Sequence, residues 1–407
     1  MIKLTYILPF LFFSVLTFSP NLTTAEISEN KIKIGLLTDM SGPYSDITGQ
    51  GAVEAVKLAI TDYGGKINGK NIELFVADHL NKADVGYVKV REWLDRDGID
   101  IVLGGGNSSV ILAISDYINE KKKPFLIPAT ATGKITNESC SYFTIHYCYD
   151  TVSAAKGTSS AVIKQGGEKW YFLTADYIFG TSLQKDASEV IYSLGGEILG
   201  SSKHPLNSSD FSSYLLKATS SKAQILGLAN ASNDLINSIK AANEFGVSKN
   251  MQIAALLMFI TDVHSLGLHT TKGLYTTTSW YWDQNGASRS WSKRFFKVMK
   301  KMPTAIHAST YSATMNYLNS VKTLNSDDGE KVIKFIKQRE VNDMYTKNAR
   351  IREDGRLMSD LKLVKVKSPS RSKYSWDYYE IIREIPAEEA FISKFKSKCR
   401  LLINKNN

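Results

Sequence analysis

Two short polar segments, each following a predicted strand, carry the groups best suited to binding a small anion. The first segment has three consecutive glycines before Asn107, Ser108 and Ser109, and it leads into a predicted helix; the second runs from Pro128 to Thr132. Backbone N–H groups at a helix start and neighbouring hydroxyls together suit a carboxylate. Helix capping by Ser108 is the alternative interpretation. The residues of this predicted anion site are Asn107, Ser108, Ser109, Ala129, Thr130, Ala131 and Thr132.

The chain lacks the sequence patterns of common catalytic and metal sites. The glycine run is neither a phosphate loop, because no Gly-Lys-Ser/Thr follows it, nor a GxGxxG motif. There is no GxSxG nucleophile elbow and no spacing that suggests a triad. The six histidines form no HExxH pattern, and the cysteines form no CxxC. We therefore expect no enzymatic activity, no cofactor and no metal ion.

Aromatic residues gather after predicted strands, where the loops are expected to face a ligand cleft. Tyr and Trp rings offer flat apolar walls with one polar tip, which suits an organic ligand. Packing within or between lobes is the alternative interpretation for each ring. The run Trp280 to Trp282 looks least like core, because adjacent side chains of an extended segment point to opposite sides. The candidate wall residues are Tyr147, Tyr149, Tyr177, Phe179, Trp280, Tyr281 and Trp282.

Short apolar runs alternate with segments of helical period, and this alternation predicts the fold. Strands separated by helices indicate parallel, doubly wound sheets. The pattern restarts after a seam near Tyr149, so the predicted fold class is α/β with two doubly wound lobes. The predicted strands lie near 32–37, 72–77, 101–103 and 125–127 in the first half, and near 171–173, 196–200, 223–228 and 252–256 in the second.

The chain continues after both halves, which indicates a hinge of several crossovers. Residues 291–336 are rich in helical pattern, and residues 352–381 have a β pattern with a turn at Asp354-Gly355. A tail that follows both halves suggests that the chain passes between the lobes more than once. No internal repeat of solenoid length is visible.

Length, composition and charge exclude several classes of protein. The chain has 407 residues, of which 43% are hydrophobic and 22% charged, as in a globular protein of two lobes. The net charge of +10 is spread thinly along the sequence, so we expect a solvated basic surface and no nucleic-acid partner.

The first 25 residues have the pattern of a secretory signal peptide. An apolar run from Leu4 to Phe18 follows Lys3, and it is shorter than a membrane-spanning helix. Small residues precede a predicted cleavage point after Ala25. An uncleaved N-terminal anchor is the alternative. The three cysteines allow one disulfide and one free thiol in an exported protein.

Several motifs resemble a known family when they are taken in order. Residues 39–44 read DMSGPY, the Ser-Ser pair follows the glycines, and residues 210–212 read DFS before a predicted helix. This order resembles the type I periplasmic binding proteins, and more closely their leucine/isoleucine/valine-binding branch. The resemblance runs across the mature chain. It implies a monomeric periplasmic receptor that delivers a small organic acid or amino acid to the membrane permease of an ABC transporter.

The resemblance also implies where the two lobes begin and end. After the signal peptide of residues 1–25, an N-terminal lobe would comprise 26–149 and 277–346, and a C-terminal lobe 150–276 and 347–407. The crossovers would lie near Tyr149, Thr276 and Thr346.

Individual site residues follow from the same resemblance. Ser108 and the segment from Ala129 to Thr132 would hold a ligand carboxylate. Phe179 would form an aromatic wall, and Ala231 stands where related proteins often carry a larger residue. A disulfide between Cys140 and Cys399 is implied, with Cys148 free.

One departure from the family pattern bears on the ligand. Amino-acid binders of this family hold the ligand ammonium with an acidic residue just after the strand that matches Gln252–Leu256. Here no carboxylate occurs until Asp262. A buried ammonium without an anion costs several kcal/mol. We therefore expect a ligand without an α-ammonium, such as an aromatic or medium-chain acid. A sensory or partner-docking protein is the alternative function, followed by an exported α/β enzyme.

Overall fold

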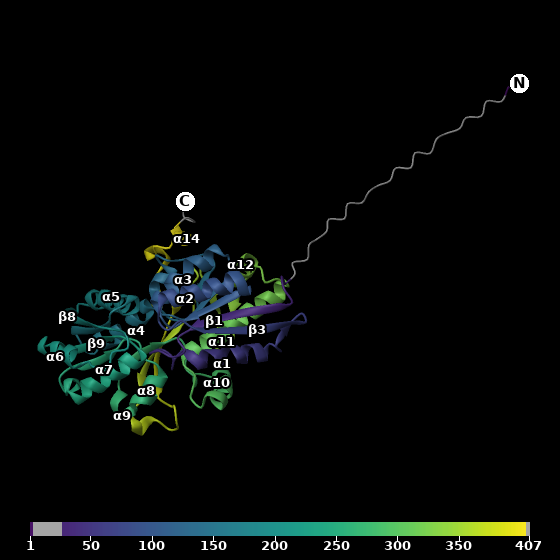
Figure 1. The fold of residues 1–407 in the computed structure, drawn as a ribbon. Helices are drawn as coiled ribbons and strands as arrows, with labels where there is room; N and C mark the ends of the chain where they lie inside the picture. Colours follow the sequence, from purple (N-terminus) through teal and green to yellow (C-terminus); the bar gives the residue numbers. More distant parts are fainter. Residues whose placement is uncertain (3–26, 404–407) are drawn as a thin grey trace.

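The computed structural model describes residues 1, 2 and 27–403 of the chain. The predicted signal peptide and its cleavage point therefore lie mostly outside the described residues. Among the residues described, no helix combines the length and the apolar character needed to cross a membrane. Two α/β units occupy the two ends of the molecule, with further elements between and beside them (Figure 1).

The first lobe is built on a six-stranded sheet in the order β2-β3-β1-β4-β5-β6, parallel except for the β2–β3 pair. Buried aliphatic residues fill its central strands, as expected for a sheet covered on both faces. Its strands are β1 (Lys31–Thr38), β2 (Lys66–Ile67), β3 (Lys70–Asp78), β4 (Ile101–Gly105), β5 (Phe125–Ala129) and β6 (Thr144–His146). Its helices include α1 (Gly49–Asp62), α2 (Ala83–Glu92) and α3 (Ser108–Glu120).

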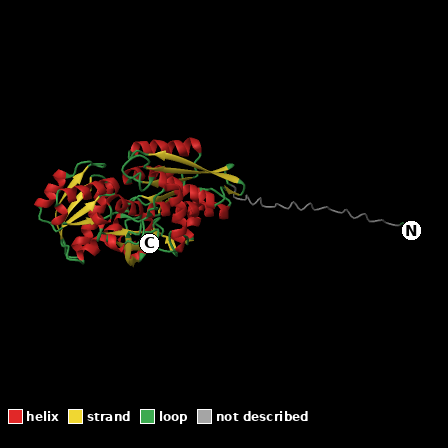
Figure 2. Ribbon diagram, turned by 90° about the horizontal axis from the view of Figure 1, so that it is seen from below, coloured by secondary structure: helices red, strands yellow, loops and turns green. Residues whose placement is uncertain are grey.

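The second lobe is built on a four-stranded parallel sheet in the order β10-β9-β7-β8. Figure 2 shows this group of strands flanked by helices at the end of the molecule away from the first lobe. Its strands are β7 (Lys169–Ala175), β8 (Glu197–His204), β9 (Ile225–Ala229) and β10 (Gln252–Ala255). Its helices are α4 (Thr151–Ile163), α5 (Ile178–Ser193), α6 (Ser212–Ser220), α7 (Ser232–Glu244), α8 (Ile260–Leu266) and α9 (Leu268–Thr271). The predicted α/β class with two parallel sheets is confirmed.

The chain then returns to the first lobe through three helices. Helix α11 packs against α1 and β5, α10 packs against α1, and α12 packs against α11. The approach of α11 to α1 is close: a Cβ on Gly51 would lie 2.2 Å from Nε2 of His307. Figure 1 shows α10 and α11 beside α1, with α12 farther from it. Their bounds are α10 (Gly286–Met299), α11 (Ala305–Leu324) and α12 (Gly329–Gln338).

Two small antiparallel sheets complete the fold. One has the order β11-β15-β16, and its strand β11 contacts α4 of the second lobe. The other has the order β12-β13-β14; its strand β13 contacts α12, and Arg356 pairs with His146 of β6. The crossover predicted near Thr346 therefore falls inside a β12–β13 hairpin that lies beside the first lobe. The strands are β11 (Tyr275–Thr278), β12 (Glu340–Val341), β13 (Ala349–Ile351), β14 (Leu357–Met358), β15 (Leu361–Val366) and β16 (Tyr379–Ile385).

Candidate ligand-binding site

Loops from both lobes enclose a small cavity beyond the carboxyl ends of β4, β5, β7 and β9, the place where ligands bind in open α/β sheets. The first lobe contributes the loops after β1, β4 and β5, and the second lobe those after β7, β9 and β10. None of the lining side chains is charged. The lining residues are Tyr44, Ile47, Gly106, Ser108, Ala129, Ala131, Tyr149, Tyr177, Phe179, Ala231, Leu257 and Ile306.

The loop after β4 presents Ser108 to the cavity. Gly106 has a φ of +93°, which favours glycine, and its N–H donates to the carbonyl of Ala129 at 2.7 Å. The Oδ1 atom of Asn107 accepts from the backbone N–H groups of Ser109 at 2.9 Å and Val110 at 3.3 Å. The cap of α3 is therefore Asn107 and not Ser108. Because capping does not need its hydroxyl, Ser108 is left at the start of α3 as part of the cavity wall.

The end of β5 and the loop after it contribute Ala129 and Ala131 to the cavity, whereas Thr130 and Thr132 are not among the lining residues. The carbonyl of Thr130 accepts from Nε2 of His146 at 2.5 Å and from the thiol of Cys148 at 3.2 Å. The hydroxyl of Thr130 is buried and lacks a hydrogen-bond partner among the described residues. The hydroxyl of Thr132 lies 3.1 Å from that of Ser182 in α5 and so bridges the lobes. Neither threonine lines the cavity.

The aromatic wall comes from both lobes. Tyr149 packs near Phe259 with ring centroids 6.0 Å apart, and Tyr177 packs near Phe179 at 5.9 Å. The hydroxyls of Tyr44 and Tyr177 lie 2.5 Å apart. Burial raises the pKa of Tyr149 and of Tyr177 well above the ordinary value, so both phenols are neutral at physiological pH. The wall is therefore aromatic and uncharged, with hydroxyl groups as its polar points.

The structure does not bring Trp280 or Trp282 to this cavity. Both indoles are buried, and the interpretation that they lie outside the core is wrong. The indole N–H of Trp280 donates to the carbonyl of Met344 at 3.0 Å, and that of Trp282 donates to the carbonyl of Trp376 at 3.0 Å. Both side chains are therefore covered by protein. They line a separate small cavity together with Phe259.

Four cavity residues were not identified from the sequence: Tyr44, Ile47, Leu257 and Ile306. Tyr44 and Ile47 lie in or just after the DMSGPY segment, which follows the predicted first strand. Their position at the carboxyl end of β1 could therefore have indicated that they line the site. Leu257 follows β10 and has no polar group to mark it. Ile306 lies in α11, which reaches the cavity only because the chain returns to the first lobe, and no local sequence signal reveals that return.

Asp262, the first carboxylate after β10, lies outside the cavity. It is buried in the first turn of α8, where Oδ2 accepts from the backbone N–H of Phe259 at 2.8 Å. Burial raises its pKa to about 7. The carboxylate is therefore already engaged in the helix start and is not placed to meet a ligand ammonium in the cavity. No group of metal-binding side chains is found in the described part of the chain.

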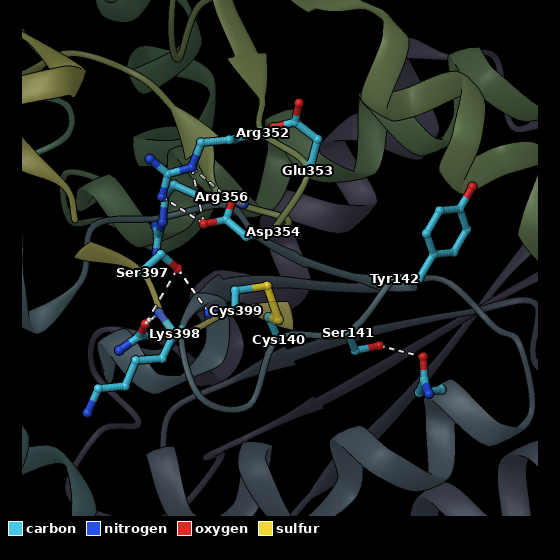
Figure 3. The surroundings of a disulfide bond; sticks show 12 residues. Cys140, Ser141, Tyr142, Arg352, Glu353, Asp354, Arg356, Ser397, Lys398 and Cys399 are labelled. Atoms are coloured by element: carbon cyan, nitrogen blue, oxygen red, sulfur yellow. Dashed lines mark hydrogen bonds and ion pairs between the residues drawn. A yellow bond between two sulfur atoms is a disulfide. The ribbon is translucent and has the colours of Figure 1, made fainter. Parts of the chain in front are cut away.

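A disulfide joins Cys140 and Cys399, the pair implied by the resemblance, with Cα atoms 5.6 Å apart. It ties the C-terminal segment to the loop before β6, near the buried ion pair of Arg352 and Asp354 at 2.7 Å (Figure 3). Cys148 is a free, buried cysteine, and burial raises its thiol pKa to about 12, so it is poorly reactive.

A larger groove of about 840 Å³ lies close to this disulfide. Its walls include Lys334, Arg350, Arg352 and Glu388, so it is charged, and none of these four residues belongs to a loop that follows a parallel strand. The smaller uncharged cavity has the position and chemistry of a ligand site, and we assign the candidate site there.

Comparisons with known proteins agree with this geometry. A family model described as periplasmic binding protein matches residues 31–373. A periplasmic binding protein from Burkholderia mallei is 52% identical, with a TM-score of 0.90 and coverage of 91% of this chain and 99% of that chain. A branched chain amino acid ABC transporter periplasmic ligand-binding protein from Burkholderia xenovorans LB400 is 37% identical, with a TM-score of 0.80 and coverage of 91% and 100%.

A more distant structure has the same fold and a bound aromatic acid. It is a solute binding protein of an ABC transporter from Rhodopseudomonas palustris BisB5 in complex with 3,4-dihydroxy benzoic acid. It is 22% identical, with a TM-score of 0.79 and coverage of 88% of this chain and 98% of that chain.

Proposed function

The chain belongs to the periplasmic binding protein family, and on that premise we propose that it is an exported receptor of an ABC importer that captures a small organic carboxylate between its lobes. The observation that carries this proposal is the uncharged cavity with Ser108 and the start of α3 on one side and aromatic rings on others. We propose further that the receptor acts in the periplasm as a monomer, delivers its ligand to a membrane permease and catalyses no reaction.

The lining of the cavity favours a ligand without an α-ammonium. No lining residue is acidic, and Asp262 is held in the first turn of α8. A carboxylate would be held by the backbone N–H and hydroxyl of Ser108 at the start of α3, and by backbone N–H groups in the loop after β5. The next N–H groups of α3 are not available, because Asn107 caps them. The rings of Tyr149, Tyr177 and Phe179 would enclose an apolar or aromatic body. The bound 3,4-dihydroxy benzoic acid in the Rhodopseudomonas palustris protein indicates that this fold can enclose such an acid.

Binding would require the lobes to move apart and then close. The centres of water molecules can occupy only about 20 Å³ of the cavity as it stands, which is room for about one water. An aromatic acid would enter after the lobes separate and dock first on the donors of the first lobe. Rotation about the crossovers would then bring the second-lobe rings over it. Closure would bury the ligand and present a continuous surface to the permease.

Calorimetry with benzoate, 4-hydroxybenzoate and leucine tests this function. We expect one of the aromatic acids to bind with a Kd of about 1 μM or tighter and leucine to bind far more weakly. Ser108→Ala should weaken binding roughly tenfold, because a buried hydrogen bond to a charged group is lost. Ser109→Ala is the matched control, because Ser109 does not line the cavity. Tight leucine binding would refute the assigned ligand class, and equal effects of the two substitutions would refute the assigned site.

A further inference from the structure

The contact between Tyr44 and Tyr177 joins the two lobes directly at the cavity. Tyr44 belongs to the loop between β1 and α1 of the first lobe, and Tyr177 to the turn between β7 and α5 of the second. Their hydroxyl oxygens lie 2.5 Å apart, and both residues line the cavity. Among the described residues, neither hydroxyl has another hydrogen-bond partner. Each phenol therefore depends on a residue from the opposite lobe.

Each tyrosine is fixed to its own lobe by backbone contacts. The N–H of Tyr44 donates to Oδ2 of Asp39 at 2.8 Å, and its carbonyl accepts from the N–H of Thr48 at 3.0 Å. The N–H of Tyr177 donates to the carbonyl of Ala175 at 2.8 Å, and its carbonyl accepts from the N–H of Thr181 at 3.1 Å. The two hydroxyls must therefore separate whenever the lobes move apart.

We propose that Tyr44 and Tyr177 are positioning residues for the binding reaction, whose hydroxyl contact forms as the lobes meet and adds to ligand affinity. This inference rests on the proposed function, since it concerns closure over a ligand. In the open form both hydroxyls are hydrated. In the closed form Tyr44 is buried and Tyr177 is half-buried beside Ile47, Leu257 and Ile306, and the mutual contact of the two hydroxyls replaces their contacts with water.

This arrangement has a distinctive energetic signature. Removing one hydroxyl leaves the other buried without a partner in the closed form, so closure becomes less favourable. Removing both hydroxyls leaves two apolar rings, and closure then buries no unpaired hydroxyl. The double variant should therefore bind the ligand better than either single variant. A residue that acted only by contacting the ligand would give additive losses instead.

The test compares Tyr44→Phe, Tyr177→Phe and the double variant with the original protein, using benzoate and 4-hydroxybenzoate as probes in calorimetry. We expect each single substitution to raise the Kd roughly tenfold and the double substitution to raise it less. Tyr171→Phe is the matched control, because its buried hydroxyl contacts that of Ser202 at 2.7 Å inside the second lobe. This control should lower the Tm and leave the Kd unchanged. Additive losses in the double variant, or single variants with unchanged Kd, would overturn the proposal.

Small-angle X-ray scattering without ligand separates this proposal from the proposed function. We expect a larger radius of gyration in each single variant than in the original protein, because the closed form loses its contact. If the original protein binds neither probe, the assigned ligand class fails, and the scattering comparison alone then decides the role of the tyrosines. Identical scattering in that case would overturn it.

Discussion

At the scale of single residues, the environment of a carboxylate matters more than its place in the sequence. Asp262 follows β10, close to where an amino-acid receptor would hold an ammonium. The structure places it in the first turn of α8, fully engaged by the N–H of Phe259. Its pKa is raised to about 7, by burial and additionally by the nearby charge of Asp46. The charged form of Asp262 is therefore a cost to the folded chain at neutral pH and is not a free ligand group.

Replacing Asp262 with Asn should change stability in a pH-dependent way. An acid whose pKa is raised on folding favours the folded state only while it is protonated. Its contribution is therefore complete below about pH 4 and is lost as the pH rises to about 7. Asn keeps a carbonyl acceptor for the N–H of Phe259 and carries no charge. Urea unfolding should show the variant more stable than the original protein at pH 8, by about 1–4 kcal/mol, and nearly equal to it at pH 4.

Asp210→Asn serves as the control, because it should change the stability at pH 8 in the opposite direction. Asp210 is exposed, and hydrogen bonds from Ser212 lower its pKa. Asp210 therefore favours the folded state when it is ionised, so its replacement should destabilise the protein at pH 8 and not at low pH. If Asp262→Asn gave the same difference from the original protein at both pH values, its raised pKa would not be the cause.

Some residues of the candidate cavity could be located from sequence, because ligand sites lie at the carboxyl ends of parallel strands, and others could not. Ser108 and Ala129 follow strands whose apolar runs are clear, so their position at the sheet edge was predictable. Thr130 and Thr132 follow the same strand but do not line the cavity, and the hydroxyl of Thr132 contacts Ser182 instead. Side-chain direction at a loop depends on neighbours such as Ser182, which is distant in sequence. The site residues remain predictions until binding is measured.

At the scale of elements, the C-terminal segment depends on tertiary contacts more than on its own secondary structure. Helix α14 (Arg400–Ile403) has four residues, and the turns before it are short. Cys399 is fully buried beside Cys140, and the backbone N–H of Lys398 donates to Oδ1 of Asn137 at 2.6 Å. Isolated helices of this length do not persist in water. The disulfide is therefore the main restraint on this segment.

Removing the disulfide should loosen the C-terminal segment before the rest of the protein. We expect Cys140→Ser together with Cys399→Ser to lower the free energy of unfolding by about 2–5 kcal/mol. Limited proteolysis should then cut the segment near Lys394–Lys398 under conditions in which the original protein resists. Cys148→Ser is the control, because Cys148 is outside the disulfide. Equal protease resistance with and without the disulfide would show that packing alone holds the segment.

Long, buried strands were predicted more accurately from the sequence than short ones. The central strands of both sheets are runs of buried apolar residues, and their positions were predicted within a few residues. Strand β6 has only three residues, and β11 reads YTTT, so neither stands out from the surrounding sequence. Both form because neighbouring strands are already in place: β5 supplies the pairing for β6, and β15 supplies it for β11. Strands that form only because a neighbouring strand is in place cannot be recognised from their own residues.

At the scale of the whole molecule, the first lobe is completed by residues that follow the second. One face of α1 is buried through Ala52, Val53, Ala55, Val56 and Ala59, and α11 packs against this helix. An ion pair between Arg294 of α10 and Asp62 of α1 joins the same elements at 2.5 Å. The ring cluster of the cavity also receives Ile306 from α11. The first lobe is therefore assembled from two distant parts of the chain.

A fragment of residues 27–147 should consequently fail to fold alone. Without α10, α11 and α12 it would expose the apolar face of α1 and one side of β5, and exposed apolar surface of that kind leads to aggregation. We expect the isolated fragment to be insoluble or to lack a cooperative thermal transition by circular dichroism. Co-expression with residues 279–338 should restore both solubility and the transition, because those residues carry the helices that cover α1. A soluble, cooperatively unfolding 27–147 fragment would show instead that the six-stranded sheet is stable by itself and that the returning helices serve mainly to connect it to the second lobe.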